Sequence, residues 1–284
     1  MQHDFNQEAL ELHKKYHGKI ETVSKVKLET REDLSRAYTP GVAEVCREIA
    51  KDPSLAREYT LKRNTVAIIS DGSAILGLGN LGPLSAIPVM EGKAAILKSF
   101  AGVDAFPICL DTQDTEEIIK AVKQVAPVFG AVNLEDISAP RCFEIEERLR
   151  KELPIPVMHD DQWGTATVVL AGLINALKVT DRVEGEDSEQ REEKKNSIKI
   201  VVNGVGSAGV AISRLLLAYG FNNIIFCDSK GVIHEKRDDL TKEKKELITT
   251  SIAVPQEGTL VDAVLGADVF VGVSKAGALT EEMA

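Results

Sequence analysis

The sequence predicts an α/β protein made of two consecutive domains, each built around a mainly parallel sheet. Short apolar runs rich in Val, Ile and Ala alternate with stretches of helical periodicity, which is typical of right-handed βαβ units. A strongly polar stretch interrupts this alternation after residue 180, and a second α/β unit begins at Ser197. We expect the first domain over residues 1–163 and the second over residues 164–284.

The elements of the first domain follow from its apolar runs. Strands are expected at Thr65–Ser70, Ala105–Leu110, Val128–Leu134 and Ile155–Met158. Helices are expected at about Gly92–Phe100, Asp114–Val125 and Cys142–Leu153. An amphipathic packing helix from Asp4 to His17 is expected at the N-terminus, where Asp4 and Gln7 have capping-box spacing and Gly18 provides the stop.

The second domain begins with an almost continuously apolar stretch, Gly164–Leu177, which predicts a buried helix that connects the two domains. The polar stretch Asp181–Asn196 predicts a solvated loop or linker. Beyond it, strands are expected at Ile198–Val202, Ile224–Cys227 and Ala267–Val271, with a helix at Ala208–Tyr219.

Composition narrows the class of protein. The chain has 284 residues, 44% of them apolar, and its 34 basic and 44 acidic side chains give a net charge of −10. This charge argues against a nucleic acid or an acidic membrane as partner. No stretch approaches the roughly 18 apolar residues of a membrane span. The four cysteines, Cys46, Cys109, Cys142 and Cys227, are scattered, so free thiols and a cytoplasmic location are expected.

A glycine motif, GxGxxG, occurs twice, and its context separates the two copies. Gly204, Gly206 and Gly209 directly follow a predicted strand and open a predicted helix, with Ser207 and Ala208 inside the loop. This arrangement predicts the pyrophosphate loop of a Rossmann domain, here incomplete at its C-terminal end. The first copy, Gly77–Gly82, lies seven residues beyond its strand and is followed by Pro83, so it reads as a substrate-domain loop.

The choice between the two nicotinamide cofactors depends on the end of the next strand. Asp228 lies 24 residues after Gly204, where a carboxylate can bind the adenosine ribose hydroxyls and favours NAD. Lys230 follows closely and is a candidate to bind the 2′-phosphate of NADP. We therefore expect NAD, with NADP as the alternative.

Two acidic pairs follow two predicted strands of the first domain. Glu135 and Asp136 come directly after one strand, and Asp160 and Asp161 come directly after the next. Because ligands of open parallel sheets bind beyond the carboxyl ends of the strands, these carboxylates are expected to converge. An all-oxygen site of this kind suits Mg²⁺ or Mn²⁺. The alternative is that the acids only cap helices at strand–helix turns.

Six ordered segments together resemble the malic enzymes, in a form whose first domain has the length of the short prokaryotic members. The segments are AYTPGVA (37–43), SDGSAILGLGNLG (70–82), EGKAAILK (91–98), NLED (133–136), HDDQWGTA (159–166) and NGVGSAG (203–209). The likeness runs from about Ser35 to the end of the chain. It implies a metal- and NAD(P)-dependent oxidoreductase that decarboxylates L-malate to pyruvate and CO₂.

The resemblance also implies residue roles. Tyr38 matches the catalytic tyrosine, a general acid, and Lys93 matches the catalytic lysine, a general base. Glu135, Asp136 and Asp161 match the ligands of the divalent metal, and Asp160 matches the carboxylate that supports the lysine. In the implied mechanism the lysine accepts the hydroxyl proton of malate as hydride leaves C2, and the tyrosine protonates C3 after CO₂ is lost.

The sequence departs from the family pattern in two places. The larger members carry a substrate-binding arginine where this chain has Ala74, so Ser73 or the backbone of Leu76–Gly79, including Gly77 and Gly79, is expected to bind the second malate carboxylate. Family members also continue for roughly another hundred residues beyond Ala284, so the chain is expected to be an incomplete catalytic unit.

Three alternatives stay open at this point. A malolactic-type enzyme would use the same residues and release lactate without free NADH. A non-catalytic nucleotide- or metabolite-binding protein would follow from the missing segment. A simple 2-hydroxy acid dehydrogenase is less favoured, because its nucleotide-binding domain usually comes first. The family resemblance also implies a homodimer or higher oligomer.

Overall fold

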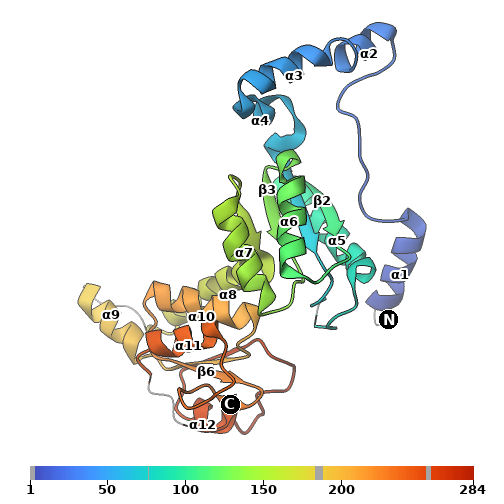
Figure 1. The fold of residues 1–284 in the computed structure, drawn as a ribbon. Helices are drawn as coiled ribbons and strands as arrows, with labels where there is room; N and C mark the ends of the chain where they lie inside the picture. Colours follow the sequence, from blue (N-terminus) through green and yellow to red (C-terminus); the bar gives the residue numbers. More distant parts are fainter. Residues whose placement is uncertain (1–3, 76, 183–187, 254–256) are drawn as a thin grey trace. The chain divides into compact units, whose positions relative to one another are not determined.

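The computed structural model describes residues 4–75, 77–182, 188–253 and 257–284 (Figure 1). The chain divides into two compact units, which are described separately. Unit 1 comprises residues 1–137 and 144–158, and unit 2 comprises residues 138–143 and 159–284. Leu76, one of the residues expected to bind substrate, and residues 183–187 of the polar stretch lie outside the described residues.

The sheet of unit 1 is formed by the four runs that the sequence predicts as strands. They are β1 (Thr65–Ser70), β2 (Asp104–Cys109), β3 (Ala131–Leu134) and β4 (Val157–His159), in the order β2-β1-β3-β4. β1 pairs in parallel with both β2 and β3. The mainly parallel sheet is therefore confirmed, and the carboxyl ends of β1 and β3 lie at the same edge.

Helices of unit 1 follow the expected order. They are α1 (Phe5–Tyr16), α2 (Arg31–Ala37), α3 (Val42–Lys51), α4 (Ala56–Tyr59), α5 (Pro83–Ala101), α6 (Thr115–Val125) and α7 (Arg141–Glu152), with short 3-10 turns at Pro53–Leu55, Leu61–Asn64 and Ala126–Val128. Helix α5 begins nine residues earlier than predicted. Its first residue is a proline, which needs no backbone donor at that position, so Pro83 starts the helix rather than preventing it.

The core of unit 1 lies where α5 packs on β1 and β2. Ile68 of β1 is fully buried against Ala86, Met90 and Ala94 of α5. Helix α6 buries Ile118, Ile119 and Val122, which recur at helical spacing. This packing holds α5 against the sheet. It therefore fixes the position of α5 side chains relative to the ends of the strands.

The N-terminal helices α1, α2 and α3 differ from α5 and α6 because they bury no side chains. Asp4 caps α1 as its spacing predicts, accepting hydrogen bonds from the backbone of Asn6 and Gln7. None of the residues of α1, α2 or α3 is buried, and Phe5 is 73% exposed. The expected packing role of α1 is therefore not seen in this chain. Apolar side chains on these helices contact too little of the described structure to be covered.

Unit 2 has a second sheet, in the order β7-β6-β5-β8. Its elements are α8 (Asp160–Val179), α9 (Ser188–Ser197), β5 (Ile200–Asn203), α10 (Ser207–Tyr219), β6 (Ile224–Asp228), β7 (Gly231–Val232), α11 (Lys242–Thr250), α12 (Leu260–Val264) and β8 (Val269–Gly272). β5 pairs in parallel with β6 and β8, whereas β7 is antiparallel to β6. The predicted strand–helix–strand unit is confirmed.

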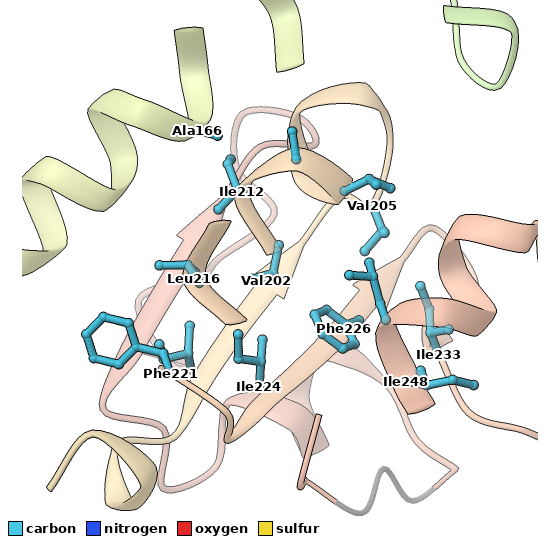
Figure 2. Close-up of a cluster of buried hydrophobic side chains, with 14 of the residues drawn as sticks. Ala166, Val202, Val205, Ile212, Leu216, Phe221, Ile224, Phe226, Ile233 and Ile248 are labelled. Carbon is cyan, nitrogen blue, oxygen red and sulfur yellow. The ribbon is translucent and has the colours of Figure 1, made fainter. Parts of the chain in front are cut away.

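The core of unit 2 joins this sheet to its helices (Figure 2). Val202 of β5 and Phe226 of β6 point to the same cluster as Ile212 and Leu216 of α10. Ala166 of α8 belongs to the same cluster, and α8 packs along α10. The apolar stretch read from the sequence as a buried helix is thus part of the core of unit 2.

The polar stretch is only partly a loop. Residues 188–197 form helix α9, where the sequence predicts a solvated linker. Polar residues can form an exposed helix when they are good helix formers, and this segment is rich in Glu, Gln, Lys and Arg. At its end, the Lys195 ammonium donates a hydrogen bond to the Tyr219 carbonyl and lies 4.2 Å from the centre of the Tyr219 ring.

The cysteines are not joined by disulfides: Cys142 and Cys227 are buried, Cys109 is half-buried, and Cys46 on α3 is exposed. Burial, with a further contribution from Asp228, raises the pKa of the Cys227 thiol to about 12. In the described ranges, no helix combines the length and the apolar content needed to cross a membrane.

Candidate active site

The first candidate segment is the loop that follows β1. Asp71 is almost fully buried, and its Oδ1 accepts hydrogen bonds from the Ser73 backbone at 3.0 Å and the Ser73 hydroxyl at 2.6 Å. The loop closes because Leu81 and Gly82 both donate to the Gly72 carbonyl. Gly72 has a φ of 68°, and a Cβ there would overlap the Gly82 backbone, so only glycine fits.

This loop holds the residues expected to bind the second carboxylate of the substrate. A hydroxyl donates a single proton, and Ser73 donates its proton to Asp71. Gly77 and Gly79 have φ values of 76° and 87°, are exposed, and have open space where a side chain would lie. The backbone at these glycines is therefore the more accessible part of the loop.

Two acidic residues stand at the end of β3. Glu135 is 6% exposed and Asp136 is 3% exposed. Backbone hydrogen bonds to β1 and its loop fix their positions. The Glu135 backbone donates to the Ile69 carbonyl of β1, and the Asp136 carbonyl accepts from the backbone of Ala74 in the loop after β1. Asp136 has a φ of 54°, a left-handed conformation that aspartate tolerates better than most residues.

Lys93 reaches this pair from α5. Its Nζ lies 3.0 Å from Oε1 of Glu135, and its side chain is 24% exposed. The other oxygen of Glu135, Oε2, accepts a hydrogen bond from the Asn133 amide at 2.7 Å. The structure therefore brings together the predicted lysine and one predicted metal ligand, and it adds an asparagine to which the sequence analysis assigns no role.

The second acidic pair opens α8, in unit 2. Asp160 and Asp161 occupy its first turn, where the helix dipole favours negative charge. His159 is fully buried, and its Nε2 lies 3.4 Å from Oδ2 of Asp161. Its Nδ1 lies 3.1 Å from the Gln162 amide nitrogen. With the amide so oriented, Nδ1 accepts a hydrogen bond from Gln162.

The donor set fits a hard divalent cation. The predicted ligands Glu135, Asp136 and Asp161 offer only carboxylate oxygens, which Mg²⁺ and Mn²⁺ prefer. Glu135 and Asp136 belong to unit 1, whereas Asp161 belongs to unit 2. Among the described residues, no three His, Cys, Asp or Glu side chains form a group that could hold a metal ion. Two of the three predicted ligands are thus adjacent in the chain at the end of β3, within unit 1.

Tyr38 lies at the C-terminal end of α2, and its carbonyl accepts the Val42 amide that begins α3. The residue is 66% exposed. The described part of the chain therefore does not enclose the tyrosine that the resemblance makes a general acid.

The glycine loop of unit 2 has the geometry that a dinucleotide requires. β5 ends at Asn203, and α10 begins at Ser207 with Gly206 as its N-cap. A Cβ on Gly209 would overlap the Gly204 carbonyl oxygen, whereas Gly206 faces open space. Gly209 thus permits close packing of the turn, and Gly206 leaves room for a phosphate at the helix N-terminus.

Asp228 ends β6, as predicted, but its carboxylate is already engaged. Arg237 donates to both oxygens at 2.9 Å, and Lys244 donates to Oδ2 at 2.7 Å. Burial acts to raise the pKa of Asp228, but these hydrogen bonds outweigh it and hold the pKa at about 2. Lys230, the candidate for the 2′-phosphate, pairs with Asp239 at 2.7 Å.

Five residues near these sites have no role in the sequence analysis: Asn133, His159, Gln162, Arg237 and Lys244. The sequence could have indicated a role for Asn133, because it is a polar residue inside an apolar strand. Arg237 and Lys244 give no such signal in the sequence, because they lie in a charged stretch. Their pairing with Asp228 depends on the tertiary structure.

The fold and the loop geometry define a two-unit α/β protein of the dinucleotide-binding class. Models of the malic enzyme N-terminal domain and the malic enzyme NAD-binding domain match residues 17–150 and 163–284. The chain belongs to the malic enzyme family.

Similar proteins agree with this assignment. An NAD-dependent malic enzyme of Geobacillus stearothermophilus is 57% identical over 93% of this chain, and a bifunctional malic/malolactic enzyme of Bacillus subtilis is 53% identical over 98%. The chain spans 53% and 65% of the lengths of these two relatives. A solved NAD-dependent malic enzyme from Thermotoga maritima superimposes with a TM-score of 0.89 at 47% identity, covering 97% of this chain and 71% of that one.

Proposed function

We propose that this chain carries the substrate- and cofactor-binding residues for oxidative decarboxylation of L-malate to pyruvate and CO₂. One observation supports this most directly: a lysine on α5 is paired with a buried carboxylate at the strand ends, Lys93 to Glu135 at 3.0 Å. The relatives named as NAD- and NADP-dependent malic enzymes support the same reaction.

Glu135, Asp136 and Asp161 are the proposed ligands of Mg²⁺ or Mn²⁺. Bound there, the cation supplies Lewis-acid polarisation of the substrate and charge stabilisation during loss of CO₂, while bound NAD(P) accepts the hydride. Lys93 pairs with the same carboxylate, so a cation held there would weaken the ion pair of the lysine by charge repulsion.

Side chains of this chain carry out the proton transfers of the proposed reaction. In its neutral amine form, Lys93 takes the proton from the C2 hydroxyl, with Asp160 as the carboxylate that supports it. Tyr38 returns a proton to C3 after CO₂ has left. The backbone at Gly77 and Gly79, or Ser73, binds the second carboxylate of malate. Loss of either proton carrier is expected to lower turnover more than binding.

The test is a coupled assay with L-malate, Mn²⁺ and NAD or NADP, followed at 340 nm and by pyruvate determination. It should be run on this chain and on one extended through the following codons. Reduced cofactor that matches pyruvate one to one, and that disappears with chelator, is the expected result. Absence of activity from both chains would favour a non-catalytic nucleotide-binding protein.

A malolactic reaction is the second candidate, because a relative at 53% identity is named as a bifunctional malic/malolactic enzyme. The same residues would serve both reactions. Lactate formed without free NADH would distinguish this reaction from the first one.

NAD is the proposed cofactor, since Asp228 places a carboxylate at the end of β6 where NAD offers ribose hydroxyls. The pairing of that carboxylate with Arg237 and Lys244 reduces its repulsion of a 2′-phosphate, so NADP is expected to be accepted as well. The ratio of kcat/KM for NAD and NADP measures this preference. A ratio well below one would overturn the proposal.

The proposed partner is a second copy of the chain, in the cytoplasm. Helix α3 has apolar residues at i, i+3, i+4 and i+7, namely Val42, Val45, Cys46 and Ile49, and none of them is buried. An amphipathic helix whose apolar face is uncovered in its own chain usually buries that face elsewhere. A second subunit is the proposed cover of this face.

A further inference from the structure

Asn133 is a buried polar residue in a strand whose neighbours are apolar. It is 7% exposed in β3, between Val132 and Leu134, which are 2% and 0% exposed. Strands of parallel sheets are usually apolar throughout, because helices cover both faces. A buried amide is unfavourable unless it forms hydrogen bonds, so this position calls for a specific partner.

The side-chain partner of Asn133 is the carboxylate two residues further on. Its Nδ2 donates to Oε2 of Glu135 at 2.7 Å. Glu135 lies one residue beyond β3, but its backbone still donates to the Ile69 carbonyl of β1. The extended chain therefore keeps residues i and i+2 on the same face and sets this pair side by side. Because the carboxylate accepts the proton of a buried amide, the hydrogen bond is of the strong, charge-assisted kind.

The two oxygens of Glu135 have different partners. Oε1 lies 3.0 Å from the Lys93 ammonium, and Oε2 is held by Asn133. A cation that approached Oε1 would compete with Lys93, since both are positive. It would not compete with Asn133, which is neutral and lies on the other oxygen. The amide can therefore hold the carboxylate in one orientation whether or not a cation is bound.

We propose that Asn133 is a positioning residue: its amide fixes the Glu135 carboxylate so that Oε1 is presented to the lysine and to the divalent cation. This inference rests on the proposed metal site. Hydrogen-bond partners of metal ligands commonly contribute about 10- to 100-fold to metal affinity. Loss of the Asn133 amide should weaken cation binding by a factor in this range.

The experiment is titration of the full 284-residue chain with Mn²⁺ alone, with free Mn²⁺ measured by electron paramagnetic resonance. Asn133→Leu removes the amide at similar size and should raise the Kd for Mn²⁺ about 10- to 100-fold. Asn64→Ala is the control, because the Asn64 amide also donates a side-chain hydrogen bond in unit 1, at 2.8 Å to the Gly102 carbonyl, and the Kd of this variant should not change.

A matched pair covers the case in which Asn133→Leu fails to fold. Asn133→Gln and Asn133→Met have nearly the same size, but only glutamine keeps the donor. Tighter Mn²⁺ binding by the glutamine variant, by about tenfold, would support the positioning role. Equal affinities in this pair, or a Kd for Asn133→Leu within twofold of the unmodified chain, would overturn it.

Glu135→Gln separates this inference from the proposed function. If the unmodified chain binds Mn²⁺ and Glu135→Gln weakens binding while Asn133→Leu does not, only the role of Asn133 is wrong. If the unmodified chain binds no Mn²⁺, or Glu135→Gln binds it equally well, the metal site itself is wrong and the role of Asn133 is overturned with it.

Discussion

At the scale of single residues, one buried carboxylate contacts both the predicted catalytic lysine and a buried asparagine. Glu135 is 6% exposed and meets Lys93 on one oxygen and Asn133 on the other. A buried carboxylate is tolerated because both of its oxygens have donors. The pairing places Lys93 beside the carboxylate that is also a proposed cation ligand.

Replacement of Lys93 tests its role as the base. Lys93→Ala should lower kcat by about 10²- to 10⁴-fold, the usual contribution of a general base, with little change in NAD affinity measured by fluorescence. Lys98→Ala is the matched control on the same helix, because Lys98 pairs with Asp104 at 2.7 Å, away from Glu135. Near-normal turnover in Lys93→Ala would remove the lysine from the mechanism.

The ion pairs of Asp228 predict a pH-dependent stability. The pKa of Asp228 is about 2 in the folded chain, below the value of about 3.9 in an unfolded one. Its stabilisation is therefore complete above pH ~4 and is lost as the pH falls toward ~2. Asp228→Asn should lower the free energy of unfolding by about 1.5–3 kcal/mol at pH 7, and the difference should shrink below pH ~4.

Urea unfolding of unit 2 at several pH values measures this difference. Glu235→Gln, an exposed carboxyl in the same segment, is the control and should change the unfolding free energy little at any pH. A difference between Asp228→Asn and the unmodified chain that is equally large at pH 7 and near pH 2 would contradict the assigned ion pairs.

At the scale of elements, two turns between a strand and a helix place the predicted glycine loops. The turn from β5 to α10 brings the backbone of Gly204 against Gly209, and the turn after β1 brings Gly72 against Gly82. Both turns need glycine because a side chain would overlap backbone. The two glycine loops thus lie on turns that are fixed by close backbone packing.

Two glycine variants separate packing from ligand contact in the α10 turn. Gly209→Ala should destabilise unit 2 and abolish NAD binding, because its Cβ would overlap the Gly204 carbonyl. Gly206→Ala faces open space at a φ of −95° and should fold normally while binding NAD more weakly. Thermal melting and NAD titration measure both. A stable Gly209→Ala that binds NAD normally would contradict the close approach.

At the scale of the whole molecule, the unburied face of α3 suggests an assembly. Val45 is 37% exposed and lies on the apolar face of the helix. A homodimer that covered this face would remove apolar area from water. It would also bring another subunit close to Tyr38, which lies four residues before α3.

A charge on this face should break the assembly. Val45→Asp is expected to shift the mass measured by light scattering from dimer to monomer, whereas Arg47→Ala, on a side chain that is 66% exposed, should leave it unchanged. A monomeric mass for the unmodified chain, or a dimeric one for Val45→Asp, would show that α3 is not the interface.

Local pattern allowed much of the fold to be predicted. The β1 run from Thr65 to Ser70 is a strand at the predicted bounds, and the strand–Gly204–helix sequence forms the predicted turn. Periodicity and turn chemistry are short-range properties, so one sequence is enough to read them. Helix α5 and the polar stretch were read less well, because proline and charged residues are compatible with more than one conformation.

By itself the sequence determined the order of the elements, the cofactor loop and the family to which the chain belongs. Tertiary structure decided which side chains meet: Asn133 and Lys93 on Glu135, and Arg237 and Lys244 on Asp228. Apart from Asn133, these partners lie far from each other or on different elements of the chain. Their contacts depend on how helices pack on a sheet, which local periodicity does not contain.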